Sequence, residues 1–210
     1  MHELDSALQA AYPVALAPCY GPFEAMSECG TRYLLSADGL WLETKLSWLH
    51  ALVPYAPLDP KLPTLPYGEL QQGFSFTAGP LPLSLIRRFI TEATAHGTVE
   101  HAALISHNTQ SGCMYQDPVV QSRSAGHIQY DYPEWDETTS LAIDLHSHGK
   151  SAAFFSRQDN RDDASQIKLA ITVGNCTGPA DAVSVVARLC LRGIYIDVTD
   201  NLIDTLTKAN

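Results

Sequence analysis

The feature that most constrains the fold of this chain is a set of four polar side chains at fixed spacing. His146 and His148 are one residue apart, and Ser156 and Asp159 follow after a further seven and two residues. Residues 141–145, directly before the first histidine, are mostly apolar and predict a strand. Because side chains alternate along a strand, the two histidines point to the same side, about 6–7 Å apart along the backbone.

The second half of the set predicts the start of a helix over about residues 157–166. Ser156 suits the N-cap position, and Asp159 stands three residues further on. Taken singly, each residue has a simpler explanation, either a surface histidine or a cap with a dipole-matched carboxylate. Taken together, two imidazoles and one carboxylate with a fourth position open are typical of a catalytic zinc site. We therefore expect Zn²⁺ to be bound by His146, His148 and Asp159.

The pattern H-x-H-x7-S-x-x-D resembles the signature of the JAMM metalloproteases, also called JAB or MPN+, and this chain fills every place. The resemblance covers roughly residues 80 to 200. The family also has a glutamate upstream, where a helix is followed by the first strand of the domain. Glu100 stands in that setting, near the start of a strand expected at 99–106 that follows a helix expected at about 83–95. Most members have proline after the second histidine, whereas this chain has Gly149, which we expect to loosen the loop.

This resemblance implies a zinc-dependent peptidase. His146, His148 and Asp159 would hold the metal, which activates water and polarises the scissile carbonyl. Glu100 would serve as general base and then as general acid, and Glu92 would be the next acid to consider. Ser156 would donate a hydrogen bond to the developing oxyanion.

The same resemblance implies the substrate class and the partners. JAMM proteins cleave after the C-terminal glycine of ubiquitin or a ubiquitin-like protein, usually at an isopeptide bond to lysine. This chain is similar to the bacterial branch that includes the PRTRC system proteins. In such operons the partners are a ubiquitin-like protein, an E1-like activating enzyme and an E2-like conjugating enzyme, and related operons are implicated in antiphage defence. The expected activity is therefore deubiquitinase-like.

Three other functions stay open at this point. One is a JAMM hydrolase that releases an amino acid from a sulfur-carrier protein, and lysine and cysteine adducts would separate it from an isopeptidase. Another is a phage-tail or cell-wall peptidase, which the absence of a secretion signal disfavours. The third is a non-catalytic MPN assembly scaffold that binds its partners through residues 1–75. Zinc content and peptidase activity would separate the scaffold from the enzymes.

Composition limits the classes of protein. The chain has 210 residues, with 45% hydrophobic and 17% charged, as expected for a globular protein. A net charge of -10 argues against a nucleic-acid partner, because binding to a phosphate backbone needs clustered Lys and Arg. No apolar run approaches the ~20 residues of a membrane span. The first residues lack the basic start and apolar core of a signal peptide, so we expect a cytoplasmic protein. The five cysteines are odd in number and form no C-x-x-C pair, so we expect free thiols.

Prolines divide the chain. They recur every third residue from Pro54 to Pro66, which is the repeat of an extended polyproline II segment. Ahead of them, strand-like stretches at 31–35 and 40–46 predict a β-hairpin. The expected parts are a small N-terminal region at 1–53, a Pro-rich linker at 54–79 and a JAMM/JAB metalloprotease domain at 80–210.

The order of elements after the linker predicts an α+β fold. We expect a JAB/MPN domain with a curved, mixed and mostly antiparallel sheet flanked by helices. Beyond the elements already named, strands are expected near 112–121, 126–131, 141–146, 167–173 and 183–197.

Other polar residues near the motif have weaker assignments. By alternation Asp144 faces the side of the histidines, where it could orient a ligand ring. His101 faces away from Glu100 and is not expected to be a ligand. Four acids ahead of the histidine strand are expected to be a solvated loop, with contact to a basic substrate tail as the alternative. They are Asp131, Glu134, Asp136 and Glu137.

Overall fold

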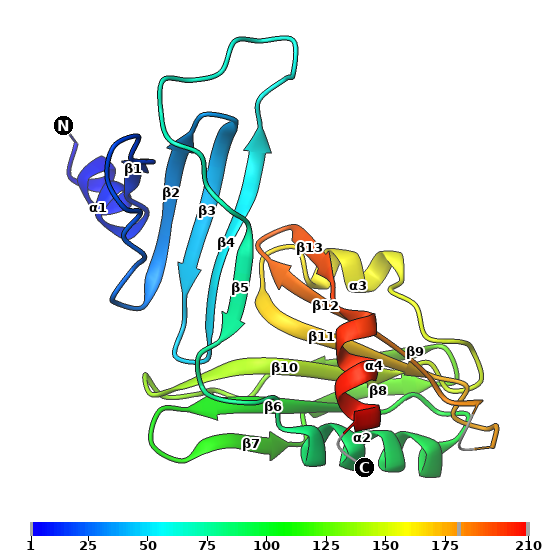
Figure 1. Ribbon diagram of the computed structural model, residues 1–210. Coiled ribbons are helices and arrows are strands. Elements are labelled where there is room, and N and C mark those ends of the chain that lie inside the picture. Colours follow the sequence, from blue (N-terminus) through cyan, green and yellow to red (C-terminus); the bar gives the residue numbers. More distant parts are fainter. Residues whose placement is uncertain (1, 180–181, 209–210) are drawn as a thin grey trace. The chain divides into compact units, whose positions relative to one another are not determined.

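The structure, a computed structural model, describes residues 2–179 and 182–208 (Figure 1). The chain divides into two compact units, residues 1–81 and residues 82–210. Each unit has its own sheet.

The first unit is a helix followed by a sheet with the strand order β1-β2-β3-β4-β5. β1 runs parallel to β2, and the other neighbours are antiparallel. The expected hairpin is confirmed, because β2 and β3 pair from Gly30 and Lys45 to Ser36 and Gly39. The elements are α1 (Glu3–Ala11), β1 (Val14–Leu16), β2 (Gly30–Ser36), β3 (Gly39–Lys45), β4 (Leu49–Pro57) and β5 (Gly73–Phe76).

The proline segment differs from the expected linker. Pro54 and Pro57 belong to β4, and β5 lies within the range 54–79 and pairs with the start of β4. The division between the units lies after Leu81 instead. A register shift next to Trp41, the partner of Pro54, shows how the strand accommodates a residue without an N–H. Sheet pairing therefore overrides the local polyproline preference.

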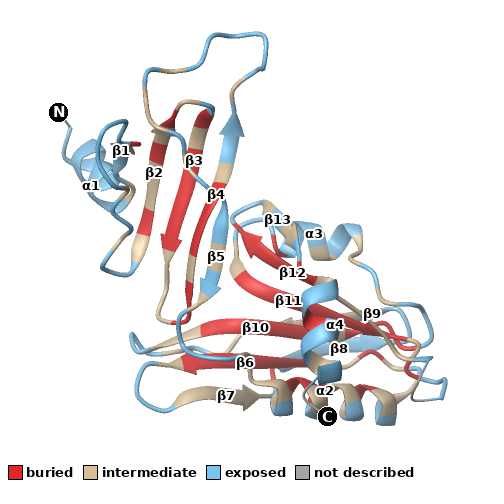
Figure 2. Cartoon of the chain, viewed as in Figure 1, coloured by how far each residue is buried: buried red, intermediate tan, exposed pale blue. Residues whose placement is uncertain are grey.

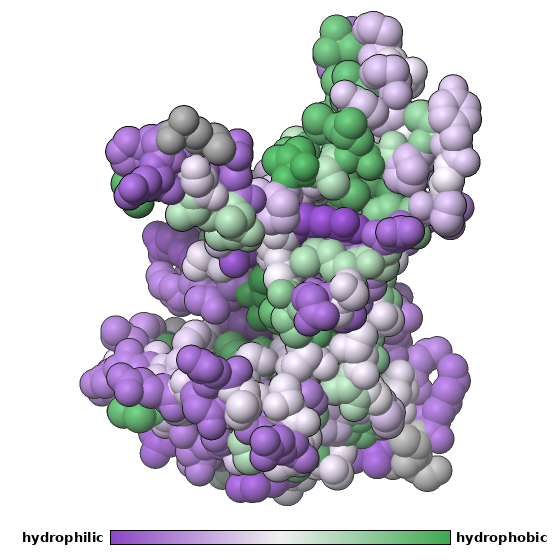
Figure 3. Space-filling view, turned by 90° about the vertical axis from the view of Figure 1, so that its left-hand side faces the viewer, coloured by the Kyte–Doolittle hydropathy of each residue, from purple (hydrophilic) through white to green (hydrophobic). Residues whose placement is uncertain are grey.

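The first unit has a small core and exposed apolar side chains. Leu34, Trp41 and Leu52 form the buried cluster of its sheet. Green atoms gather on part of its surface in Figure 3, and several large aliphatic side chains are more than half exposed. They are Leu4, Leu8, Val14, Leu16 and Leu62.

The second unit is built on a sheet with the strand order β13-β12-β11-β10-β6-β7. β10 and β11 are parallel, and the other neighbours are antiparallel, so the α+β, mostly antiparallel prediction is confirmed. β8 and β9 form a separate hairpin. The elements are α2 (Leu83–His96), β6 (Ala102–Asn108), β7 (Gly112–Gln116), β8 (Val119–Ser124), β9 (His127–Asp131), β10 (Thr139–Ser147), α3 (Arg157–Asp162), β11 (Ile167–Gly174), β12 (Ser184–Leu191), β13 (Ile194–Asp197) and α4 (Thr199–Lys208).

Burial explains why these segments adopt these structures. β10 lies between β11 and β6, and Figure 2 shows it and its neighbours as largely buried, which fits its mostly apolar sequence. In α2 the buried residues Ile86, Phe89 and Ala93 recur at helical spacing. The helix ends at Gly97, whose φ of 63° suits glycine. No helix in the described ranges is long and apolar enough to cross a membrane.

Several boundaries differ from the sequence prediction. β6 begins at Ala102, so Glu100 precedes the strand in which it was expected. The expected strand at 112–121 is two strands, β7 and β8, with a break between them. α3 is shorter than the predicted helix, and α1 and α4 were not predicted.

Candidate metal centre

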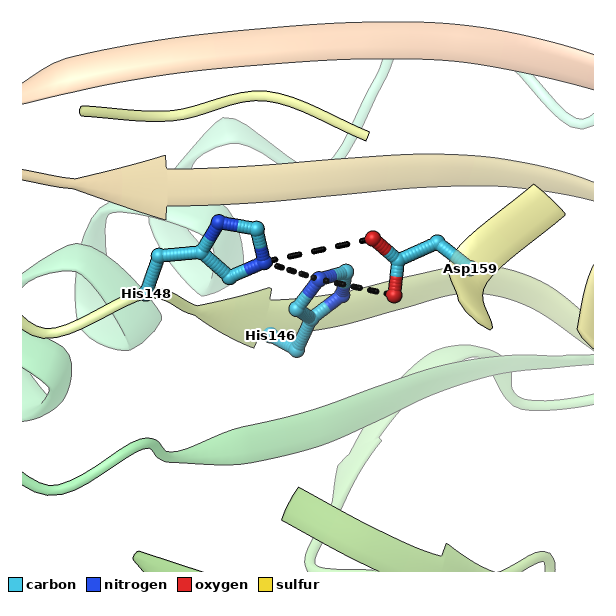
Figure 4. Close-up of side chains that lie close together, drawn as sticks. All are labelled: His146, His148 and Asp159. Carbon is cyan, nitrogen blue, oxygen red and sulfur yellow. Dashed lines mark hydrogen bonds and ion pairs between the residues drawn. The ribbon is translucent and has the colours of Figure 1, made fainter. Parts of the chain in front are cut away.

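The three proposed metal ligands come from one β-α-β crossover. His146 lies near the end of β10, His148 directly follows that strand, and Asp159 is in the first turn of α3. Since β11 returns parallel to β10, α3 begins near the carboxyl end of the histidine strand. Figure 4 shows both imidazole rings turned toward the carboxylate of Asp159.

The distances between the ligand atoms fit one tetrahedral metal ion. Nε2 of His146 lies 3.2 Å from Nε2 of His148 and 3.5 Å from Oδ1 of Asp159, and Nε2 of His148 lies 3.9 Å from Oδ2. Ligands at zinc–nitrogen distances of ~2.0–2.1 Å on a tetrahedron are separated by about 3.3–3.4 Å. Among the described residues, these three form a group whose ligand atoms all lie within 4.8 Å of one another. They therefore suit zinc with a position left open.

A capping box holds the start of α3. The Ser156 Oγ accepts a hydrogen bond from the Asp159 N–H at 3.1 Å, and the Ser156 N–H donates to Asp159 Oδ2 at 2.5 Å. The second bond fixes the carboxylate of Asp159 relative to the helix. Ser156 is thus both the cap and a neighbour of the ligand.

Glu100 lines the same cavity as the ligands. This cavity has a volume of about 760 Å³, and its lining includes Glu100, Ser156 and all three metal ligands. The Glu100 N–H donates to the Ser124 carbonyl at 2.9 Å, which fixes the segment ahead of β6. Burial raises the pKa of the Glu100 carboxyl, although a charge on His146 partly offsets this effect. A carboxyl with a raised pKa beside candidate metal ligands suits a general base.

The ligands themselves have shifted pKa values. Burial acts to lower the pKa of His146, but the carboxylate of Asp159 outweighs it and leaves that pKa raised. Burial, and then the charge on His146, lower the pKa of His148 to about 4. Burial acts to raise the pKa of Asp159, but His146 and the N–H of Ser156 hold it well below its usual range. At neutral pH Asp159 is therefore ionised and His148 is neutral.

The loop after the histidines is tight, so the expectation that Gly149 loosens it is wrong. Gly149 has a φ of 53°, and a Cβ there would lie 2.7 Å from the Thr98 carbonyl oxygen. Its own carbonyl accepts from the Cys176 N–H at 2.7 Å, and the Ser151 N–H donates to the His148 carbonyl at 3.0 Å. Proline, whose φ is fixed near −65°, does not fit this backbone.

Asp144 is buried in the cavity wall but does not orient a histidine by a hydrogen bond. Its carboxylate accepts from the Tyr130 and Tyr132 hydroxyls and from the ammonium of Lys168. The prediction that Asp144 faces the side of the histidines is confirmed, because it lines the same cavity. The prediction that it orients a histidine ring is wrong.

The remaining candidates lie elsewhere. Among the described residues, the cavity lining includes none of the four loop acids, and Asp136 caps its own turn through Thr138. Glu92 on α2 accepts from Arg88 and from the Tyr115 hydroxyl, away from the cavity lining. His101 stacks on Phe89 and is not among the metal-ligand group.

Some residues of the site were not found from the sequence. Thr172 Oγ1 lies 3.3 Å from His146 Nε2, and the ring of Phe154 packs edge-on against His148 at 4.5 Å. His127, at the start of β9, lines the cavity and acts electrostatically on Glu100. Of these residues, only Phe154 could have been suspected from the sequence, because it lies in the loop between the histidines and Ser156. The positions of Thr172 and His127 depend on strand register and on the path of the β8–β9 hairpin.

The fold and the site define a domain of the JAB/MPN class. Comparison with protein families supports this assignment: residues 82–188 match the model for prokaryotic homologs of the JAB domain. The match covers half of the chain, which therefore belongs to this family. Residues 2–77 match a domain of unknown function, DUF2016. A search of curated proteins gives no match.

Proposed function

We propose that the second unit is a zinc-dependent isopeptidase that cleaves after the C-terminal glycine of a ubiquitin-like protein. The observation that carries the proposal is the meeting of three ligand atoms with Glu100 and Ser156 in one cavity. JAB domains are often hydrolases, although prokaryotic members can be non-catalytic. The presence of all these polar groups in one cavity supports the proposal of an enzyme.

The residues have distinct chemical roles in this proposal. Zn²⁺ held by His146, His148 and Asp159 would supply an activated water molecule and polarise the scissile carbonyl. Glu100 accepts a proton from the attacking water and delivers it to the leaving amine, for which its raised pKa is suited. The Ser156 hydroxyl can rotate to donate to the developing oxyanion while its oxygen still caps α3.

The substrate class comes from the resemblance to JAMM enzymes, and the shape of the site supports it. Residues 125–130, at the turn of the hairpin and along β9, line the cavity. Among the described strands β9 pairs with β8 alone, so its second edge can pair with an extended tail. A ubiquitin-like C-terminus has this form, and the conjugate would come from E1-like and E2-like partners in a bacterial operon, in the cytoplasm.

A non-catalytic scaffold is the second candidate, and one observation favours it. Exposed aliphatic side chains on the first unit, including Leu4, Leu8 and Leu16, are of the kind found at protein–protein contacts. A sulfur-carrier hydrolase would share the metal centre but would release a small amino acid.

The test is hydrolysis of ubiquitin-like fusions, lysine conjugates and cysteine adducts by the zinc-loaded protein. Glu100→Gln should bind zinc and lose turnover, whereas Glu92→Gln, a carboxylate outside the cavity lining, should keep both. Cleavage of cysteine adducts alone would favour the sulfur-carrier alternative. Bound zinc without cleavage would remove the isopeptidase proposal for these substrates, and absence of zinc would favour the scaffold.

A further inference from the structure

A buried lysine connects the strand and the helix that carry the metal ligands. Lys168 on β11 is 1% exposed. Its ammonium donates to Asp144 Oδ2 at 2.5 Å, to Asp163 Oδ1 at 2.8 Å and to the Tyr132 hydroxyl at 2.8 Å. Each of its three hydrogens therefore has an acceptor, and the side chain is fixed in one position.

The two carboxylates bound by Lys168 stand next to metal ligands in the chain. Asp144 is two residues before His146 on β10. Asp163 is the C-cap of α3, and its N–H donates to the Asp159 carbonyl at 2.9 Å. One ammonium thus links the strand of His146 to the helix of Asp159.

A second buried cation holds the same end of α3. The Arg188 guanidinium donates to Asp163 Oδ2 at 2.6 Å and to Asn160 Oδ1 at 2.5 Å. The guanidinium lies between the rings of Phe155, at 3.9 Å, and Tyr195, at 4.2 Å. These contacts allow little movement of the C-terminal end of α3 relative to β12.

The helix needs this support. α3 has six residues, none of them buried, and a helix so short is marginal without tertiary contacts. Lys168 and Asp163 are themselves buried, and buried charges are tolerated only where they are paired. Because these bonds are directional, they favour one orientation of Asp163 relative to Lys168 and Arg188.

We propose that Lys168 and Asp163 are positioning residues that hold Asp159 against the two histidines before the metal binds. The inference rests on the proposed zinc site and assigns no catalytic step to either residue. It predicts that zinc affinity depends on groups that do not touch the ion, because outer partners of this kind determine how ligands are oriented.

The test is zinc affinity measured by competition with a chelator. Asp163→Asn removes the charge at the end of α3 and should weaken zinc binding by about 10–100-fold. Asp144→Asn weakens the other ion pair of Lys168 and should also weaken zinc binding. This variant provides the test if Asp163→Asn does not fold. Phe89→Leu, a core change on α2, supplies a variant that loses stability without touching the network.

A double-mutant cycle separates positioning from general destabilisation. In an Asp159→Ala background, Asp163→Asn should cause no further loss of zinc affinity, because its effect passes through Asp159. In a His148→Ala background its full effect should remain. An equal loss in both backgrounds, or an equal loss with Phe89→Leu, would overturn the inference.

The outcome also distinguishes this inference from the proposed function. Wild-type protein that binds zinc, with Asp163→Asn binding equally tightly, would overturn the positioning role alone. Wild-type protein that binds no zinc would overturn the metal site and the inference together.

Discussion

The Nε2 atoms of His146 and His148 lie 3.2 Å apart and both face the carboxylate of Asp159. Two neutral imidazole nitrogens meet at this distance only when one of them carries a proton or when both donate lone pairs to a cation. The same arrangement therefore accepts either a proton or a metal ion. A metal ion bound there would displace the proton, so the proposed zinc site should respond to both metal concentration and pH.

Zinc should stabilise the second unit. At free zinc one hundred times above the dissociation constant, stabilisation is about 2.7 kcal/mol. At about 4 °C per kcal/mol for a domain of this size, the melting temperature should rise by about 10 °C. Thermal scans with and without zinc measure the shift. His148→Ala should abolish most of it and His101→Ala should not, and equal responses of the two variants would refute the ligand assignment.

Zinc affinity should fall as the pH decreases through the raised pKa of His146. Below that pKa the metal must displace one proton, so the dissociation constant should rise about tenfold per pH unit. His148, with a pKa of about 4, is already neutral and should add no second proton near neutrality. Chelator competition between about pH 5 and pH 8 gives the slope.

The dissociation constant should begin to rise at the pKa of His146, and this break in the pH profile can be tested with a control variant. Asp159→Asn removes the carboxylate that raises the pKa of His146, so the break should move to lower pH as the affinity falls. A slope of two protons in the wild type, or an unmoved break in the variant, would contradict this account.

Ser156→Ala should separate two effects of one hydroxyl. Loss of the N-cap should cost about 0.5–2 kcal/mol of stability. Loss of an oxyanion donor should raise the barrier by about 2.7–4 kcal/mol and lower kcat about 10²–10³-fold. Zinc should still bind, since the bond from the backbone N–H to Asp159 remains. Ser156→Thr should restore both properties, and unchanged kcat in Ser156→Ala would leave the residue as a cap alone.

Local patterns predicted the parts of the fold that depend on neighbours in sequence. The stripe of Ile86, Phe89 and Ala93, ended by Gly97, defines α2 closely. The spacing of Ser156 and Asp159 defines the start of α3, and the apolar run before His146 defines β10. In each case one short stretch of sequence contains both the signal and its physical cause.

The remaining parts depend on pairing between distant segments. From the sequence alone, Lys168 is an ordinary charged residue in a strand. Only the register that pairs Asp144 with Ala170 brings Lys168 beside Asp144. The proline spacing predicts that Pro54 belongs to a linker, and only its pairing with Trp41 shows that it lies in a strand. The positioning network and the extent of the first unit were therefore not accessible from local patterns.

The contact between Gly149 and Thr98 yields the last prediction. Gly149 directly follows His148, a proposed metal ligand. The Thr98 carbonyl that a Cβ at this position would meet lies two residues before Glu100. Gly149→Ala should therefore cost about 1–2 kcal/mol for the left-handed backbone, and more for the displaced carbonyl. Moving that carbonyl should also displace Glu100 within the cavity, so kcat should fall while zinc remains bound.

Unfolding in denaturant and single-turnover cleavage measure the two effects. Gly126→Ala is the matched control for stability, because a Cβ at Gly126 meets nothing within 4 Å. Gly149→Pro should be worse than Gly149→Ala, since its φ cannot reach the observed 53°. If Gly149→Pro were as stable and active as the wild type, the loop would have to adopt a different backbone that is compatible with proline. The close approach to Thr98 would then have no part in holding Glu100 near the proposed metal ligands.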